Sequence, residues 1–290
     1  MTKHSLLSGK QPFEAALSSR TISKMKTKPI TLLIILLWSQ GIIFSQTNNE
    51  ISIGQRIQID SEIYGKSRTL HIGLPSDYND SAKNYPVLYI LFPEWSFERA
   101  KSAADYLEGS KGIPGLILVG ICGEDTWNEV FPFRVDRIPT SGGGDVFLNF
   151  IGDEVIPFVE SNYRADSLRI LAGFSNSAMF ANYVMIHEPD LFKSFILSSP
   201  MLGWGDDYVL KETRDFFSNI HSFDKTLYMI YGNLDYDQVT DPMPQLEKLL
   251  IDKAPENFSC KIDILENESH VPYIDVYKGL VYTFEELNKK

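Results

Sequence analysis

From residue 51 onward, short apolar runs alternate with segments that have the spacing of amphipathic helices. This alternation is typical of repeated strand and helix units around a mostly parallel sheet. After a leading hairpin, strands are predicted at residues 86–92, 115–121, 169–172, 194–198, 226–231 and 260–265. The pattern therefore predicts a doubly wound α/β domain.

The hairpin and the helices complete this prediction. Two apolar runs at residues 53–62 and 68–74 meet at Gly65, which favours an antiparallel hairpin and brings the strands to eight. Helical patterns lie at about residues 97–107, 145–161, 177–187, 243–253 and 274–287. Residues 123–144 have no clear periodicity, so we expect a long irregular loop there, of the kind that often carries function.

The first 45 residues have the layout of an export signal. An apolar stretch over residues 30–44 follows three lysines. As a helix it would rise only about 22 Å, which is short of the roughly 30 Å hydrocarbon core of a membrane. We predict a signal peptide at residues 25–45, a true start at Met25 with residues 1–24 as a spurious extension, and a secreted or periplasmic domain at residues 46–290. An uncleaved membrane anchor is the alternative.

The charge of the chain argues against one class of partner. The formal net charge is −11, and loss of the first 45 residues would remove six basic residues and one acidic residue, leaving −16. A strongly acidic protein repels phosphate backbones, so we expect no nucleic-acid partner. No Cys/His set has zinc spacing and the acidic residues form no calcium loop, so no metal or other cofactor is predicted. Nothing in the sequence determines an oligomeric state.

The run RILAGFSNSAMF at residues 169–180 carries the main chemical signal. It places Gly173, Ser175 and Ser177 between a predicted strand and a predicted helix, close to the G-x-S-x-G elbow. A serine on this sharp turn is held at the carboxyl end of the sheet with a strained backbone. Ser177 stands where the elbow usually has Gly, so we expect some strain there but a preserved turn. Ser175 is the predicted nucleophile.

A serine hydroxyl needs a base, and histidine is the usual one because its pKa of about 6.5 lies near working pH. His270 follows the last predicted strand, which is where the base belongs if the chain order is serine, acid, histidine. The other histidines lie in the leader, an early strand, a helix end and a loop: His4, His71, His187 and His221. Asp235 and Asp237 follow the preceding strand, and Asp235 is favoured as the residue that orients the imidazole.

An oxyanion hole needs two backbone N–H donors. The amide of Asn176, next to the nucleophile, is the first. The second should follow the third predicted strand, and because Pro93 has no N–H it is expected at Glu94 or Trp95. The Gly-rich run at residues 141–145 lacks the Lys of a phosphate-binding loop, so we interpret it as a flexible lead-in to the next helix.

Taken in order, these blocks resemble a known family. The segments YPVLYILFPEW, LILVGI, RILAGFSNSAMFA, HEPDLFKSFILSSP and ESHVP resemble those of the putative esterase family of α/β-hydrolases, which includes enterochelin esterases and esterase D. The resemblance covers residues 51–290. It implies an α/β-hydrolase fold, with an eight-stranded, mostly parallel sheet and helices on both faces.

The resemblance also implies a triad that acts on carboxylic esters, with Ser175 as nucleophile, Asp235 or Asp237 as acid and His270 as base. Two positions depart from the family: Pro93 and Ser177 stand where glycine is common.

The only two cysteines, Cys122 and Cys260, lie in β-patterned runs. Such runs are typical of buried thiols, although export would also permit a disulfide. The strand order implied by the resemblance separates them by several strands, so two free thiols are expected.

The leading hypothesis for function is hydrolysis of a small-molecule or saccharide ester through an acyl-enzyme on Ser175. Acyl transfer by the same triad is an alternative. A non-catalytic binding module on a hydrolase scaffold is a second alternative, favoured by Pro93 and Ser177.

Overall fold

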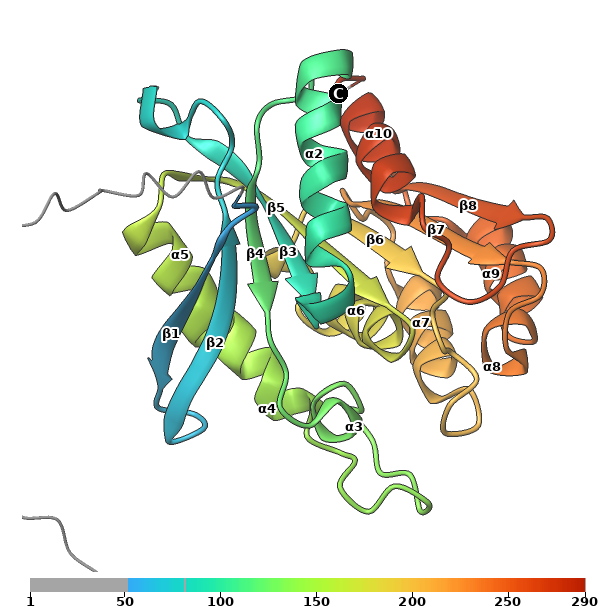
Figure 1. The fold of residues 1–290 in the computed structure, drawn as a ribbon. Helices are drawn as coiled ribbons and strands as arrows, with labels where there is room; N and C mark the ends of the chain where they lie inside the picture. The colour runs from blue at the N-terminus through green and yellow to red at the C-terminus, as the bar shows by residue number, and fades with distance from the viewer. Residues whose placement is uncertain (1–51, 81, 290) are drawn as a thin grey trace, which may run out of the picture. The chain divides into compact units, whose positions relative to one another are not determined.

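The computed structural model describes residues 52–80 and 82–289, which contain one eight-stranded sheet (Figure 1). The strand order is β1-β2-β4-β3-β5-β6-β7-β8. The six strands β4, β3, β5, β6, β7 and β8 run parallel to one another, whereas β2 is antiparallel to both β1 and β4. The strands are β1 (Gln55–Ser61), β2 (Lys66–Gly73), β3 (Tyr85–Leu91), β4 (Ile117–Ile121), β5 (Ala165–Phe174), β6 (Ser194–Ser198), β7 (Thr226–Gly232) and β8 (Ser259–Leu265). The predicted α/β-hydrolase fold is confirmed; the predicted leader lies outside the described residues.

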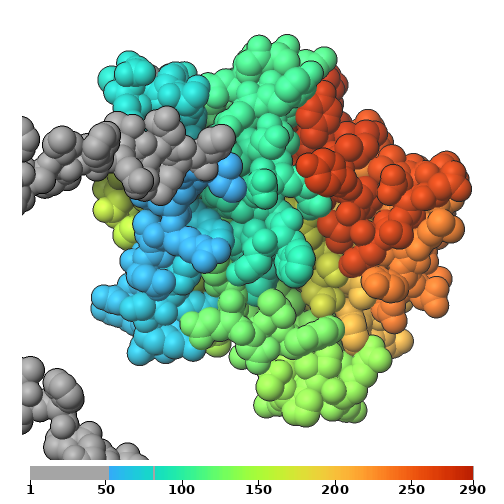
Figure 2. Space-filling view, in the orientation of Figure 1, coloured from blue at the N-terminus to red at the C-terminus, as the bar shows by residue number. Residues whose placement is uncertain are grey.

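Helices cover both faces of the sheet (Figure 1). One face packs against α2 (Phe97–Lys111) and α10 (Asp275–Leu287). The other packs against α4 (Gly144–Asn149), α5 (Ile156–Asn162), α6 (Asn176–His187), α7 (Tyr208–Asn219) and α9 (Met243–Lys253). In the space-filling view, α2 lies between the β1–β2 hairpin and α10 (Figure 2). The central strands are buried on both sides, which explains why they appear in the sequence as continuous apolar runs.

Two helical segments differ from the prediction. The helix predicted at residues 145–161 contains a π-helical turn, η3 (Phe150–Val155), just before Pro157, whose nitrogen has no hydrogen to donate to the preceding turn. The helix α7 was not predicted; its apolar side chains pack beneath β6 and β7 in the same core as α6.

The segment predicted as an irregular loop at residues 123–144 contains a short helix, α3 (Thr126–Glu129), and packs through its aromatic side chains. Trp127 and Phe131 stack at 5.8 Å between ring centroids, and both rings contact Trp204 edge-on. The glycines before α4 are not a free hinge, because the amides of Gly143 and Gly144 donate to carbonyls of this segment. Close packing leaves no space for a Cβ at Gly143 and Gly144, whereas Gly142 adopts a φ of 105° that favours glycine.

Candidate active site

Ser175 occupies the turn between β5 and α6 with φ of 57° and ψ of −124°. Positive φ is costly for a residue with a Cβ, so the turn is a strained elbow of the predicted kind. Gly173 makes it possible: a Cβ at this position would lie 2.4 Å from the carbonyl oxygen of Ser177. The close backbone crossing therefore excludes any larger residue at Gly173.

Ser177 is not strained, contrary to the expectation from the sequence. It lies within α6, is 5% exposed, and its hydroxyl donates to the carbonyl oxygen of Phe174 at 2.8 Å and accepts from the Phe174 amide at 2.9 Å. The hydroxyl thus ties the end of β5 to the first turn of α6. The departure from glycine adds two hydrogen bonds to the elbow.

His270 lies between the predicted nucleophile and the favoured acid. Its Nε2 is 2.8 Å from Ser175 Oγ, and its Nδ1 is 2.6 Å from Asp235 Oδ1. The Tyr236 ring packs against the imidazole with centroids 4.7 Å apart. Asp237, the alternative acid, is instead the first residue of α8 (Asp237–Thr240). The structure therefore joins Ser175, His270 and Asp235 in one hydrogen-bond chain.

The carboxylate of Asp235 is fully buried and accepts several hydrogen bonds. Burial alone would raise its pKa, but bonds from His270, the Ser199 hydroxyl and the Tyr236 amide outweigh burial and hold the pKa below its ordinary value. Asp235 is thus an anion at neutral pH, suited to stabilise an imidazolium.

Ser199 is a residue of the site that the sequence analysis missed. Its Oγ donates to Asp235 Oδ2 at 2.5 Å and accepts from the Val271 amide at 2.8 Å, so it connects the loop after β7 to the loop that carries His270. Its backbone has φ of 50°, which is uncommon for a residue other than glycine. That positive φ is a property of the folded loop, and no sequence motif marks it.

A cavity of about 300 Å³ opens at Ser175 and His270. We call it the catalytic cavity. Its other walls are mainly apolar, formed by Leu91, Phe92, Trp95, Phe174 and Val271. Arg99 on α2 is the one cation among its lining residues, and its guanidinium lies 3.1 Å from Asp275 Oδ2. Burial raises the pKa of Asp275 to about 6, although Arg99 opposes the shift. The cavity suits an apolar acyl or aryl group.

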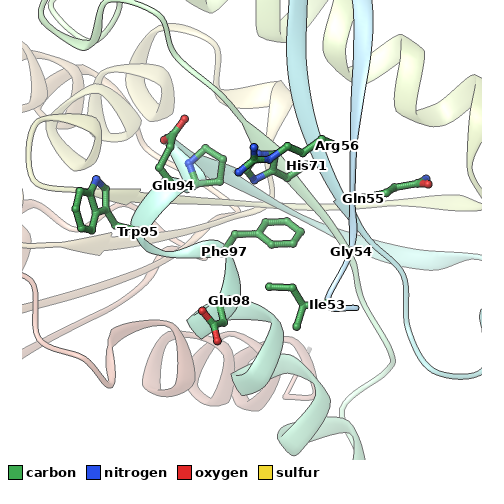
Figure 3. Close-up of a pocket in the computed structure, with 10 residues that line it drawn as sticks. Ile53, Gly54, Gln55, Arg56, His71, Glu94, Trp95, Phe97 and Glu98 are labelled. Carbon is green, nitrogen blue, oxygen red and sulfur yellow. The ribbon is translucent and has the colours of Figure 1, made fainter. Parts of the chain in front are cut away.

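The candidate oxyanion donors differ in position. Trp95 lines both the catalytic cavity and a neighbouring one, whereas Glu94 lines only the neighbouring one (Figure 3). Both belong to the short turn η2 (Pro93–Trp95), which follows Phe92 at φ of 53°. Pro93 packs on Gly120 of β4, where a Cβ would lie 2.6 Å from the proline ring. Pro93 is thus a packing residue beneath the turn.

The side chain of Asn176, the residue after Ser175, is fixed by a hydrogen bond. Trp204 Nε1 donates to Asn176 Oδ1 at 2.9 Å, and the Trp204 ring packs on the aromatic cluster of the segment at residues 123–144. This segment therefore supports the residue whose amide is the first oxyanion candidate.

Among residues 52–80 and 82–289, no three His, Cys, Asp or Glu side chains gather as a metal site would require. Within the same residues no helix has both the length and the hydropathy needed to cross a membrane. His187 pairs with Glu212, and His71 lies on β2 in the cavity next to the catalytic one.

Known proteins resemble this chain in sequence and in fold. A family model described as "Putative esterase" matches residues 61–243. Ferri-bacillibactin esterase BesA of Bacillus subtilis is 28% identical over 197 residues, which are 59% of this chain and 67% of the relative. The siderophore enterobactin esterase of Emericella nidulans is 35% identical over 85 residues, 28% of each chain.

A solved structure supports the fold. The IroE-like serine hydrolase from Shewanella oneidensis superimposes with a TM-score of 0.73 at 22% identity, over 81% of this chain and 80% of that one. The family match covers more than half of the chain and includes both β5 and β7. The chain belongs to the putative esterase family of α/β-hydrolases and is a carboxylic-ester hydrolase.

Proposed function

We propose that this protein is an exported serine esterase that cleaves a carboxylic ester through an acyl-enzyme on Ser175. In this mechanism Ser175 Oγ attacks the ester carbonyl while His270 Nε2 takes the hydroxyl proton. Asp235 holds Nδ1 and stabilises the imidazolium. His270 then returns the proton to the departing alcohol oxygen as the C–O bond breaks. A water molecule, activated by the same base, attacks the acyl-enzyme and releases the acid.

The observation that carries the proposal is the continuous hydrogen-bond chain of Ser175, His270 and Asp235 at the floor of a cavity. The amides of Asn176 and of Trp95 or Glu94 are the donors for the oxyanion that forms during attack. Pro93 and Ser177 favoured a non-catalytic module, but neither interrupts the hydrogen bonds of Ser175, His270 and Asp235. Pro93 packs on Gly120, and Ser177 bonds the backbone of Phe174.

The relatives support a small-molecule ester as substrate. The Emericella relative is named for a siderophore, and the apolar walls of the catalytic cavity suit a compact acyl or aryl group. A panel of methyl esters with aliphatic and aromatic acyl groups should identify the acyl group with the highest kcat/KM.

A fluorophosphonate probe tests the serine mechanism directly. An activated hydroxyl reacts with the probe without the natural substrate, so wild-type protein should be labelled at Ser175. Labelling should disappear in Ser175→Ala and fall sharply in His270→Ala. Ser218→Ala is the control, because this exposed hydroxyl bonds only its own helix and should leave labelling intact. Folded wild-type protein that stays inert for hours would refute the esterase mechanism.

Export is the second part of the proposal and rests on the lysine-flanked apolar stretch at residues 30–44. Amino-terminal sequencing of the protein recovered from the periplasm or medium should give a first residue near Gln46. A mature chain that retains residues 1–24, or recovery only from the cytoplasm, would contradict it.

A further inference from the structure

A second cavity of about 330 Å³, which we call the outer cavity, is lined by residues of β1, β2, η2 and α2 (Figure 3). Trp95 lines both this cavity and the catalytic cavity, so the two cavities meet at this side chain. Trp95 is 94% exposed. Tryptophan is rarely left so exposed, because its indole buries a large apolar area when it finds a partner. The ring therefore offers an open apolar face between the two cavities.

The walls of the outer cavity come from β1, β2, η2 and α2. Arg56 on β1 and His71 on β2 are direct partners across the hairpin, and the His71 imidazole meets the Phe97 ring edge-on at 5.5 Å. Figure 3 shows Arg56 and His71 together near Phe97, with Glu94 on the η2 turn. Glu98 on α2 completes the polar lining. The cavity thus combines an aromatic floor with charged and polar side chains.

These groups both donate and accept hydrogen bonds. Burial, and then the nearby Arg56 charge, lower the pKa of His71, so the imidazole is neutral at pH 7 and has one donor and one acceptor nitrogen. The guanidinium of Arg56 supplies donors, and among the described residues no hydrogen bond or ion pair engages it. Glu94 and Glu98 are acceptors. Two carboxylates beside one guanidinium do not favour an anionic ligand, so the cavity matches a neutral group with several donors and acceptors.

The two cavities differ in polarity, so together they match an ester with one apolar half and one polar half. The catalytic cavity is walled mainly by apolar side chains, whereas the outer cavity combines charged and polar side chains with the rings of Trp95 and Phe97. An ester held with its carbonyl at Ser175 extends one half to each side of the scissile bond. The apolar half matches the walls at Ser175, and a polar half would pass over Trp95 into the outer cavity.

We propose that the outer cavity binds the alcohol half of the substrate, and that this half is a neutral alcohol carrying several hydroxyl or amide groups. One apolar face of the alcohol lies on the Trp95 ring, Arg56 donates to its oxygens, and Glu94 and Glu98 accept from its O–H or N–H groups. The inference rests on the proposed function, because it takes Ser175 as the point of attack. It adds the chemistry of the leaving group.

The test uses three esters of the acyl group that the methyl-ester panel selects: the methyl ester, a glucose 6-ester and an ester of N-acetylserine amide. The glucose ester carries hydroxyl groups and the N-acetylserine amide ester carries amide groups, so the two esters show which of these groups the outer cavity prefers. We expect at least one of them to exceed the methyl ester in kcat/KM by about 10-fold, mainly through a lower KM, since one charged hydrogen bond is worth about 1.5–3 kcal/mol and 1.4 kcal/mol is tenfold.

Variants test whether the preference for one alcohol depends on residues of the outer cavity. Arg56→Gln and Trp95→Ala should each lower the ratio of kcat/KM for the preferred ester to that for the methyl ester by about 5- to 10-fold. Arg214→Gln is the matched control, because this arginine lies on α7 and contacts Gln245. It should leave the ratio at the wild-type value. A wild-type ratio near one, or a ratio that neither Arg56→Gln nor Trp95→Ala changes, would overturn the inference.

A binding measurement without turnover separates this inference from the esterase proposal. Methyl glucoside and N-acetylserine amide are titrated into Ser175→Ala protein, with tryptophan fluorescence as the signal. Saturable binding of at least one that weakens with Arg56→Gln supports the outer cavity even if no ester is hydrolysed. Methyl-ester hydrolysis with no alcohol preference and no saturable binding would leave the esterase and refute the outer cavity as its alcohol site.

Discussion

Asp235 accepts hydrogen bonds from three directions, which fixes its carboxylate before any substrate arrives. His270 Nδ1 and the Tyr236 amide reach Oδ1, and the Ser199 hydroxyl reaches Oδ2. A carboxylate held in this way sets both the tautomer and the tilt of the imidazole, so the position of Ser175 Oγ relative to its base depends on residues remote in sequence.

Replacement of the acid tests this dependence. Asp235→Asn should lower kcat by about 10⁴-fold, because an amide at this position stabilises the wrong histidine tautomer. Asp237→Asn should have little effect, since Asp237 starts α8 instead of bonding His270. Steady-state kinetics on the best methyl ester provides the measurement. If Asp237→Asn were the more damaging change, Asp237 would be the acid.

Ser199→Ala removes the hydroxyl that links Asp235 to the Val271 amide. A hydrogen bond to a charged group is worth about 1.5–3 kcal/mol, so kcat/KM should fall by about 10- to 100-fold, with the change mainly in kcat. Ser194→Ala is the control: this buried serine lies in the preceding strand and bonds Thr283 at 2.8 Å. Equal losses in both variants would indicate a purely structural role for Ser199.

At the scale of elements, the elbow between β5 and α6 is the most constrained junction. Strand and helix meet so closely that the backbone of the first helical turn lies over Gly173, and Ser177 bonds back to the strand at Phe174. The strain at Ser175 is offset by this packing, since α6 is buried along most of its length.

Gly173→Ala should therefore destabilise the fold. The new Cβ would meet backbone atoms that cannot rotate away, so the free energy of unfolding should fall by about 1–3 kcal/mol or more, together with activity. Gly109→Ala is the matched control: Gly109 is exposed on α2, and a Cβ added there would have no atom within 4 Å. Alanine there should stabilise by about 0.5–1 kcal/mol. Urea unfolding measures both, and an unchanged Gly173→Ala midpoint would contradict the crowded elbow.

At the scale of the whole molecule, the strand order determines which distant segments meet. β5, β6 and β7 are neighbours, so the loops that carry Ser175, Ser199 and Asp235 emerge side by side at the carboxyl ends of these strands. The loop after β8 brings His270 to the same end of the sheet. This is the general rule for open α/β sheets, in which sites form at the carboxyl ends of strands.

The same strand order keeps the two cysteines apart. Cys122 follows β4 and Cys260 lies in β8, with β3, β5, β6 and β7 between them. The separation exceeds the roughly 7 Å between Cα atoms that a disulfide can span, and both thiols are free in the structure. Titration of denatured, non-reduced protein should find two thiols. A count of zero would be incompatible with this sheet.

The sequence alone was sufficient for the fold class, because buried parallel strands are continuous apolar runs and their number and spacing are visible in the chain. It also predicted Ser175 as nucleophile and His270 as base, since the elbow and the position after the last strand are local features. The segment at residues 123–144 and the helix α7 were not recovered, because their order comes from aromatic packing and burial, not from periodicity.

Only the tertiary structure decided which acid meets His270 and what surrounds Ser175. Asp235 and Asp237 are two residues apart, and the sequence favoured Asp235 without excluding Asp237. A carboxylate bonds the imidazole only if its loop directs it there, and that depends on Ser199 and Val271 from other loops. The outer cavity likewise joins β1, β2 and α2. Contacts between segments far apart in the chain depend on strand order, which local sequence patterns do not encode.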